Sequence, residues 1–219
     1  MSLIDGSYFT GSILIPNLTY GAVSPAVYGS DILQAIVQYE ADILTQLLGY
    51  SLYKLLLADL DGDGNPQTER FTNLIDGAEF TNDYIGTDQT LKWNGFRNTA
   101  KISLIAYYVF YKYVERNANQ MSVVGNTDLK SEDSDKVSPI RKMTDAFYEM
   151  RKLYGIIPPY IRFWHDSVLG SELPSVYNDL SSAYNFLFAN KVTYPEWVFT
   201  PQKGVIFLGY ELSIIPACI

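Results

Sequence analysis

The sequence predicts a mainly α-helical protein: a small helical bundle with a long loop, an N-terminal arm and a C-terminal β-hairpin. Several segments repeat apolar residues at steps of three and four, which is the pattern of helices with one buried face. Gly and Pro interrupt the chain where these patterns stop. A length of 219 residues suits one domain, or one domain with arms. We expect an arm at 1–30, a helical core at 31–159 and a C-terminal region at 160–219.

The N-terminal part is expected to change from an irregular arm to a long helix near residue 31. Residues 12–16 suit a short strand, and Asp31 is a plausible N-cap for a helix over 32–48. Gly49 is expected to end that helix, and a second short helical piece is expected at 50–57. The buried stripe of the long helix is predicted to consist of Ile32, Ile36, Tyr39, Ile43 and Leu47.

The middle of the chain contains the strongest helical pattern. Residues 58–90 are acidic and turn-forming, with a brief helix expected near 71–75, and an aromatic helix is expected at about 95–117. That helix carries five aromatic side chains within seven residues: Tyr107, Tyr108, Phe110, Tyr111 and Tyr113. A helix that is apolar nearly all round lies either in a large core or between subunits. An ordinary core helix and a subunit interface both remain open.

The remainder of the chain is predicted to be a loop, two helices and a hairpin. A polar loop at 119–138 precedes a helix at 140–154, which Gly155 ends. A further helix is expected at 175–189. The C-terminal β-hairpin is expected from 197–199 and 205–208, and an apolar tail at 212–219 needs a surface to bury it, in this subunit or another.

The composition favours an interaction protein. Hydrophobic residues make up 47% of the chain and charged residues only 18%, against roughly 25% in soluble proteins, while Tyr occurs 18 times. Tyr suits surfaces that become buried on assembly, because it joins a broad apolar body to one polar tip.

The net charge of -8 is unevenly distributed along the chain. Residues 1–90 hold twelve acidic and two basic residues (net -10), residues 91–163 seven acidic and twelve basic (net +5), and residues 164–219 five acidic and two basic (net -3). The acidic and basic segments are expected to attract one another, either within a subunit or between neighbours. No compact Lys/Arg cluster predicts sequence-specific binding of nucleic acid.

No catalytic machinery is predicted. His165 is the only histidine and Cys218 the only cysteine, so Cys/His metal sites and an intramolecular disulfide are excluded by count. The chain has no nucleophile elbow, dinucleotide-binding fingerprint or P-loop. We therefore expect no enzyme, no catalytic residue and no cofactor-binding residue. We also expect no signal peptide and no membrane partner, and synthesis in a reducing cytoplasm.

The acidic stretch at 59–69 is the one candidate metal site. Asp59, Asp61 and Asp63 alternate and precede Gly64, as in the first half of a calcium loop. The second half departs from that pattern, because Arg70 occupies the position of the bidentate Glu. A solvated acidic turn is the favoured interpretation, and calcium is the one cofactor that stays open.

Several short segments of the sequence resemble the head-to-tail connector (adaptor) proteins of tailed bacteriophages, particularly those of crAss-like phages that infect Bacteroides. The resemblance covers about residues 31–155, and the matching segments lie at 39–40, 47–49, 74–80, 92–95, 105–115, 124–126 and 143–150. It implies a helical bundle repeated as a homo-oligomeric ring, a dodecamer, under the portal protein.

On that resemblance, the ring extends the DNA channel and offers a platform to the tail or to further ring proteins. DNA passes through without sequence-specific binding, and the location is the head-tail interface of the virion, after synthesis in the host cytoplasm. The acidic excess suits such a channel, because phosphate contacts to Lys and Arg would hold DNA back. The competing class is a calcium-stabilised surface or binding module that uses residues 59–69.

Overall fold

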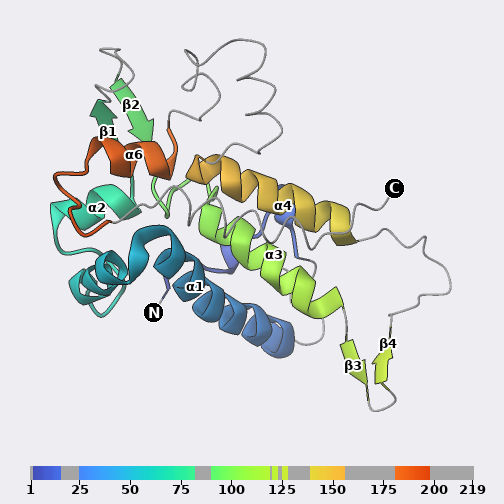
Figure 1. Ribbon diagram of the computed structural model, residues 1–219. Helices are drawn as coiled ribbons and strands as arrows, with labels where there is room; N and C mark the ends of the chain where they lie inside the picture. Colours follow the sequence, from blue (N-terminus) through green and yellow to red (C-terminus); the bar gives the residue numbers. More distant parts are fainter. Residues whose placement is uncertain are drawn as a thin grey trace, which may run out of the picture.

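The computed structural model describes residues 2–15, 25–81, 90–118, 120–122, 125–127, 139–155 and 181–197 (Figure 1). These residues form a mainly α-helical fold, as the sequence predicts. Their helices are α1 (Pro25–Asp59), α2 (Glu69–Ile75), α3 (Leu104–Ala118), α4 (Pro139–Tyr154) and α6 (Ala183–Ala189). Their strands are β1 (Ala78–Thr81), β2 (Thr90–Trp93), β3 (Gln120–Ser122) and β4 (Gly125–Thr127). Strand β1 pairs antiparallel with β2, and β3 pairs antiparallel with β4.

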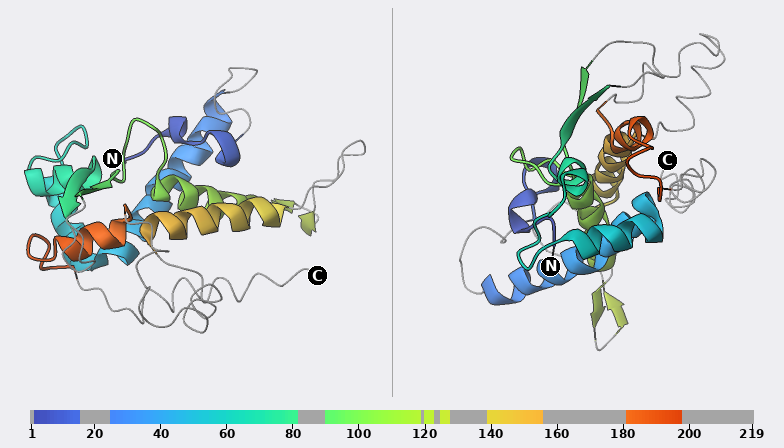
Figure 2. Two further views of the ribbon diagram at one scale, coloured as in Figure 1. Left: turned by 90° about the horizontal axis from the view of Figure 1, so that it is seen from above. Right: turned by 90° about the vertical axis from the view of Figure 1, so that its left-hand side faces the viewer.

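The centre of the fold is a layer of three helices in which α3 lies between α1 and α4 and packs against both (Figure 1). The aromatic side chains of Tyr108, Phe110 and Tyr111 are no more than 3% exposed. Packing within the subunit therefore accounts for these three aromatics, as the core-helix alternative predicts. The hairpin of β3 and β4 lies beyond the far end of α3, away from the rest of the described chain (Figure 2).

Helix α1 bends sharply at Gly49, whose φ of 78° and ψ of 153° are not helical. Only glycine adopts this conformation readily, because it has no Cβ. The predicted stop at Gly49 and the predicted short helix after it are confirmed. The predicted N-cap at Asp31 is wrong: the helix begins earlier, at Pro25, and proline is well suited to a first helical position.

The carbonyl groups before such a break lack their intrahelical donors. One of them, the Leu47 carbonyl, accepts a hydrogen bond of 3.1 Å from the indole Nε1 of Trp197. Tyr194 adds a second link from the same segment, because its hydroxyl donates to the Arg70 carbonyl at 2.6 Å. Residues 181–197 are thereby fastened to both α1 and α2.

The aromatic helix starts at Leu104 rather than near residue 95. The side chain of Asn98 accepts from the Ile102 amide and donates to the Ile102 carbonyl, and the Ser103 hydroxyl accepts from the Ile105 amide. These short polar side chains satisfy backbone groups locally and so compete with helix formation. Lys101 between them adopts a positive φ of 58°.

Of the other expected elements, some are confirmed, some are wrong and some lie outside the described residues. The helices expected near 71–75 and at 140–154 are confirmed as α2 and α4. The strand expected at 12–16 is wrong, since Gly11–Ile13 is a single 3-10 turn. The turn-forming stretch 58–90 contains β1 and the start of β2, and the loop expected at 119–138 contains β3 and β4. The parts outside the described residues are 175–180 of the helix expected at 175–189, residues 198–199 and 205–208 of the hairpin, and the tail 212–219.

Candidate functional site

The acidic loop between α1 and α2 is closed by its own carboxylates. Asp61 Oδ1 accepts from the backbone amides of Asp63 and Asn65, both at 2.8 Å. Asp59 Oδ2 accepts from the amides of Gln67 and Thr68, at 2.9 and 3.1 Å. The hydrogen bond from Asn65 is the main cause of a lowered pKa of Asp61, because backbone donors favour the charged carboxylate.

The three candidate calcium ligands thus have different positions in this loop. Asp59 and Asp61 already use carboxylate oxygens to close the turn, whereas the Asp63 side chain is exposed. Within the described ranges, no group of three or more His, Cys, Asp or Glu side chains is close enough to hold a metal ion. The observed geometry is that of an internally hydrogen-bonded acidic turn.

Two glycine turns cross in direct backbone contact beside this loop. Gly77, at the start of the β1–β2 hairpin, has a φ of 95°, and Gly95, at its end, has a φ of 82°. A Cβ added at Gly77 would lie 2.4 Å from the Trp93 carbonyl oxygen, and one at Gly95 would lie 2.3 Å from the Ile75 carbonyl oxygen. Any larger residue at either glycine would force the two backbones apart.

The crossing is fixed by two hydrogen bonds to the end of α2. The Trp93 indole donates to the Leu74 carbonyl at 2.9 Å, and the Arg97 amide donates to the Ile75 carbonyl at 2.8 Å. The crossing joins residues 74–77 to residues 93–97. These two stretches overlap two of the short segments that carry the phage-connector resemblance, 74–80 and 92–95. The two segments therefore form one packed structural unit.

The side chain of Arg97 joins the crossing to the acidic loop. Its guanidinium forms a double ion pair with Asp76, at 2.8 and 3.1 Å, and also contacts the Gly64 carbonyl and the Asn65 side chain at 3.4 Å. Arg97 belongs to the basic segment and Asp76 to the acidic one. In this pair the two segments attract one another within the subunit.

The carboxylate of Glu40 holds the start of the chain. It is only 7% exposed and lies on the buried side of α1. It accepts from the Ser2 hydroxyl at 2.6 Å, from the Leu3 amide at 2.9 Å and from the Ile4 amide at 3.4 Å. Burial raises the pKa of Glu40, and these hydrogen bonds offset part of that increase.

An apolar surface remains on α1 after the bend at Gly49. Tyr50 is 70% exposed and Leu57 is 51% exposed, and the exposed Lys54 lies between them at helical spacing. The opposite side of the same helix buries Leu52 and Leu56 completely. Tyr50 and Leu57 therefore point away from the core that this helix helps to form, and we call them the outer face of α1.

The structure and the sequence differ in what they single out. His165 and Cys218 lie outside the described residues. The docking by Glu40 was missed, although an acidic residue four positions after Ile36, on the buried stripe, was a readable signal. No helix in the described portion has both the length and the apolar character that a membrane span requires.

Comparison with known proteins identifies no relative. No family model matches the chain, and neither a curated protein nor a solved structure matches it. The functional argument therefore rests on the residues and their geometry.

Proposed function

We propose that this chain is a structural, non-enzymatic virion protein that assembles into a ring between the portal and the tail of a tailed phage. In this role it extends the DNA channel and provides a platform for tail attachment. The proposal joins the sequence resemblance to a surface property of the folded chain.

The outer face of α1 is the observation that carries the proposal. The subunit already has a filled core, in which side chains of α1, α3 and α4 are fully buried. Tyr50 and Leu57 remain in water, whereas Leu52 and Leu56 of the same helix are buried. This arrangement suits a chain whose remaining apolar surface is covered on assembly. Aromatic residues are favoured at such interfaces.

The direct test is sedimentation and native mass measurement of the purified protein, alone and with portal protein. We expect a ring of identical subunits, whose contacts are heterologous. A protein that stays monomeric under every condition, portal included, contradicts the proposal.

A matched pair of variants locates the effect. Tyr50→Asp places a charge on the outer face of α1 and is expected to shift assembly toward the monomer. Ser51→Asp adds the same charge at the next exposed position of the helix and is expected to leave assembly unchanged. Equal loss of assembly in both variants would show that added charge, and not the outer face, is responsible.

A further inference from the structure

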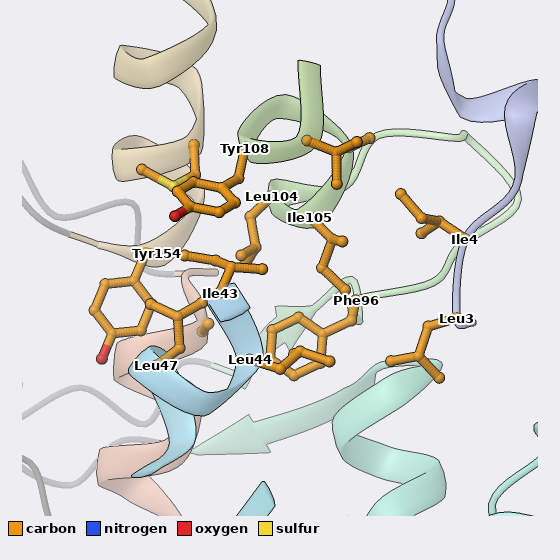
Figure 3. Close-up of a cluster of buried hydrophobic side chains, with 14 of the residues drawn as sticks. Leu3, Ile4, Ile43, Leu44, Leu47, Phe96, Leu104, Ile105, Tyr108 and Tyr154 are labelled. Carbon is orange, nitrogen blue, oxygen red and sulfur yellow. The ribbon is translucent and has the colours of Figure 1, made fainter. Parts of the chain in front are cut away.

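The N-terminal segment, residues 2–15, is bound to the helix layer in the manner of a docked peptide. Its regular structure consists of two single turns of 3-10 helix, Gly6–Tyr8 and Gly11–Ile13. Leu14 is 49% exposed, but the other six large apolar side chains of the segment are at most 8% exposed: Leu3, Ile4, Tyr8, Phe9, Ile13 and Ile15. Figure 3 shows Leu3 and Ile4 in one buried cluster with side chains of α1, α3 and the preceding loop.

Polar contacts fix the register of this segment at two points. Glu40 accepts hydrogen bonds from the amides of Leu3 and Ile4 and from the Ser2 hydroxyl, so it binds mainly backbone groups of the segment. Further along, the Tyr8 hydroxyl accepts from the Asn98 amide at 3.1 Å, and the Lys101 ammonium lies 4.6 Å from the centre of the Tyr8 ring. We call Glu40, Asn98 and Lys101 the docking residues.

None of these contacts requires the segment and the docking residues to belong to the same chain. Among the described residues, no strand pairs with this segment, and the hydrogen bonds inside it join residues only two or three positions apart. Nine residues, 16–24, separate it from α1. Covalent geometry allows the ten steps between residues 15 and 25 to span up to about 35 Å.

We propose that the docking residues also accept the N-terminal segment of a neighbouring copy, so that adjacent subunits are joined by exchange of residues 2–15. This inference rests on the proposed ring, which holds copies side by side at high effective concentration. An exchanged segment makes the same contacts as an unexchanged one, so the exchange has little energetic cost. Each exchanged segment adds six buried apolar side chains to the contact between two subunits.

Two full-length variants test the exchange by complementation. Leu3→Asp spoils the segment and leaves the docking residues intact, whereas Glu40→Ala spoils the docking residues and leaves the segment intact. The variants are assembled separately and as an equal mixture, and hydrogen exchange is followed by mass spectrometry. The peptides covering residues 2–10 differ in mass between the variants, so the two segments are read independently.

If subunits exchange their N-terminal segments, only one of the two segments should become protected from hydrogen exchange. In the mixture, the segment of the Glu40→Ala chain docks on the Leu3→Asp chain, and the hydrogen exchange of its amides is expected to be about tenfold slower than in the separate Glu40→Ala sample. The segment of the Leu3→Asp chain is expected to stay unprotected. If neither segment gains protection while the mixture assembles, the exchange is overturned and the ring proposal stands.

A second measurement covers the case in which these variants do not fold. A photo-crosslinker replaces the exposed Thr10 in the otherwise unchanged chain, and a crosslinker at Val192, which is 95% exposed on another segment, serves as the control. Exchange predicts crosslinks between copies at position 10, identified by dimer mass and by peptides of the docking site. Crosslinks confined to single chains in an assembled sample overturn it, and complete failure to assemble overturns the ring and the exchange together.

Discussion

Glu40 and Asp61 do the same task in opposite surroundings. Each carboxylate accepts two backbone amides and so fixes a stretch of chain without regular structure. Glu40 does this inside the core and its pKa is raised, whereas Asp61 does it in a solvent-exposed loop and its pKa is lowered. At both sites hydrogen bonds favour the charged form and burial opposes it; burial is the larger effect at Glu40, and the hydrogen bonds are the larger effect at Asp61.

The two sites therefore differ in what a failure would cost. Amides released in the acidic loop are solvated by water at once, but the amides of Leu3 and Ile4 belong to residues that are no more than 5% exposed. A buried donor without an acceptor is expensive, and an exposed one is nearly free. The following predictions break or sharpen this contrast.

The largest effect is expected from Glu40→Ala. Removing the carboxylate leaves the amides of Leu3 and Ile4 without their acceptor and loosens residues 2–15, so the free energy of unfolding should fall by about 2–4 kcal/mol. Urea denaturation measures the change. The control is Glu40→Gln, which keeps one acceptor oxygen and should cost about 1 kcal/mol or less; equal losses in the two variants would refute the role of the hydrogen bonds.

A pH series should separate the charge of Glu40 from its hydrogen bonds. Because its pKa is raised in the folded state, the stability it contributes is full below its ordinary value of 4.5 and is lost as pH rises through the folded pKa. The wild-type chain should thus gain stability relative to Glu40→Gln as pH falls from 7 toward 4.5. A constant difference across this range would show that the pKa is not raised.

Asp61→Asn should have a smaller effect and the opposite pH dependence. The lowered pKa of Asp61 contributes stability above its ordinary value of 3.8, and this contribution is lost as pH falls through the folded pKa. The cost of the substitution should therefore shrink only below pH 3.8. Denaturation curves measure it, and a cost that matches Glu40→Ala would contradict the contrast between the two sites.

Calcium should have the smallest effect of all. The oxygens of Asp59 and Asp61 already accept amides that close the turn, and we expect millimolar calcium to leave the melting temperature unchanged. A ligand that binds only the folded state would raise it by mass action. A rise that EDTA reverses and that Asp63→Asn abolishes would establish the calcium-module alternative.

Local sequence patterns predicted the helices more successfully than they predicted the long-range contacts. Apolar periodicity found α1, α4 and the body of α3, and the backbone freedom of glycine placed the break at Gly49. The β1–β2 hairpin escaped prediction because it depends on a crossing of Gly77 and Gly95, which brings segments 18 positions apart into backbone contact. The start of α3 escaped because Asn98 and Ser103 satisfy backbone groups that a helix would otherwise use.

The same limit applies to the candidate site. Alternating acidic residues drew attention to Asp59, Asp61 and Asp63, but they did not show that Asp59 and Asp61 accept hydrogen bonds from their own loop, which depends on the exact path of the chain. The docking of residues 2–15 depends on side chains more than thirty positions away, as in the pair of Ser2 and Glu40. Such pairings have no short-range pattern.

The hydrogen bond from Trp197 to the Leu47 carbonyl connects residues 150 positions apart and has a consequence for the order of events during synthesis. The ribosome releases the chain from its N-terminal end, so both halves of α1 are exposed long before the indole leaves the tunnel. Until then the Leu47 carbonyl accepts hydrogen bonds from water. The hydrogen bond that Trp197 adds beside the bend at Gly49 therefore forms late, after the two halves of α1 have been synthesised.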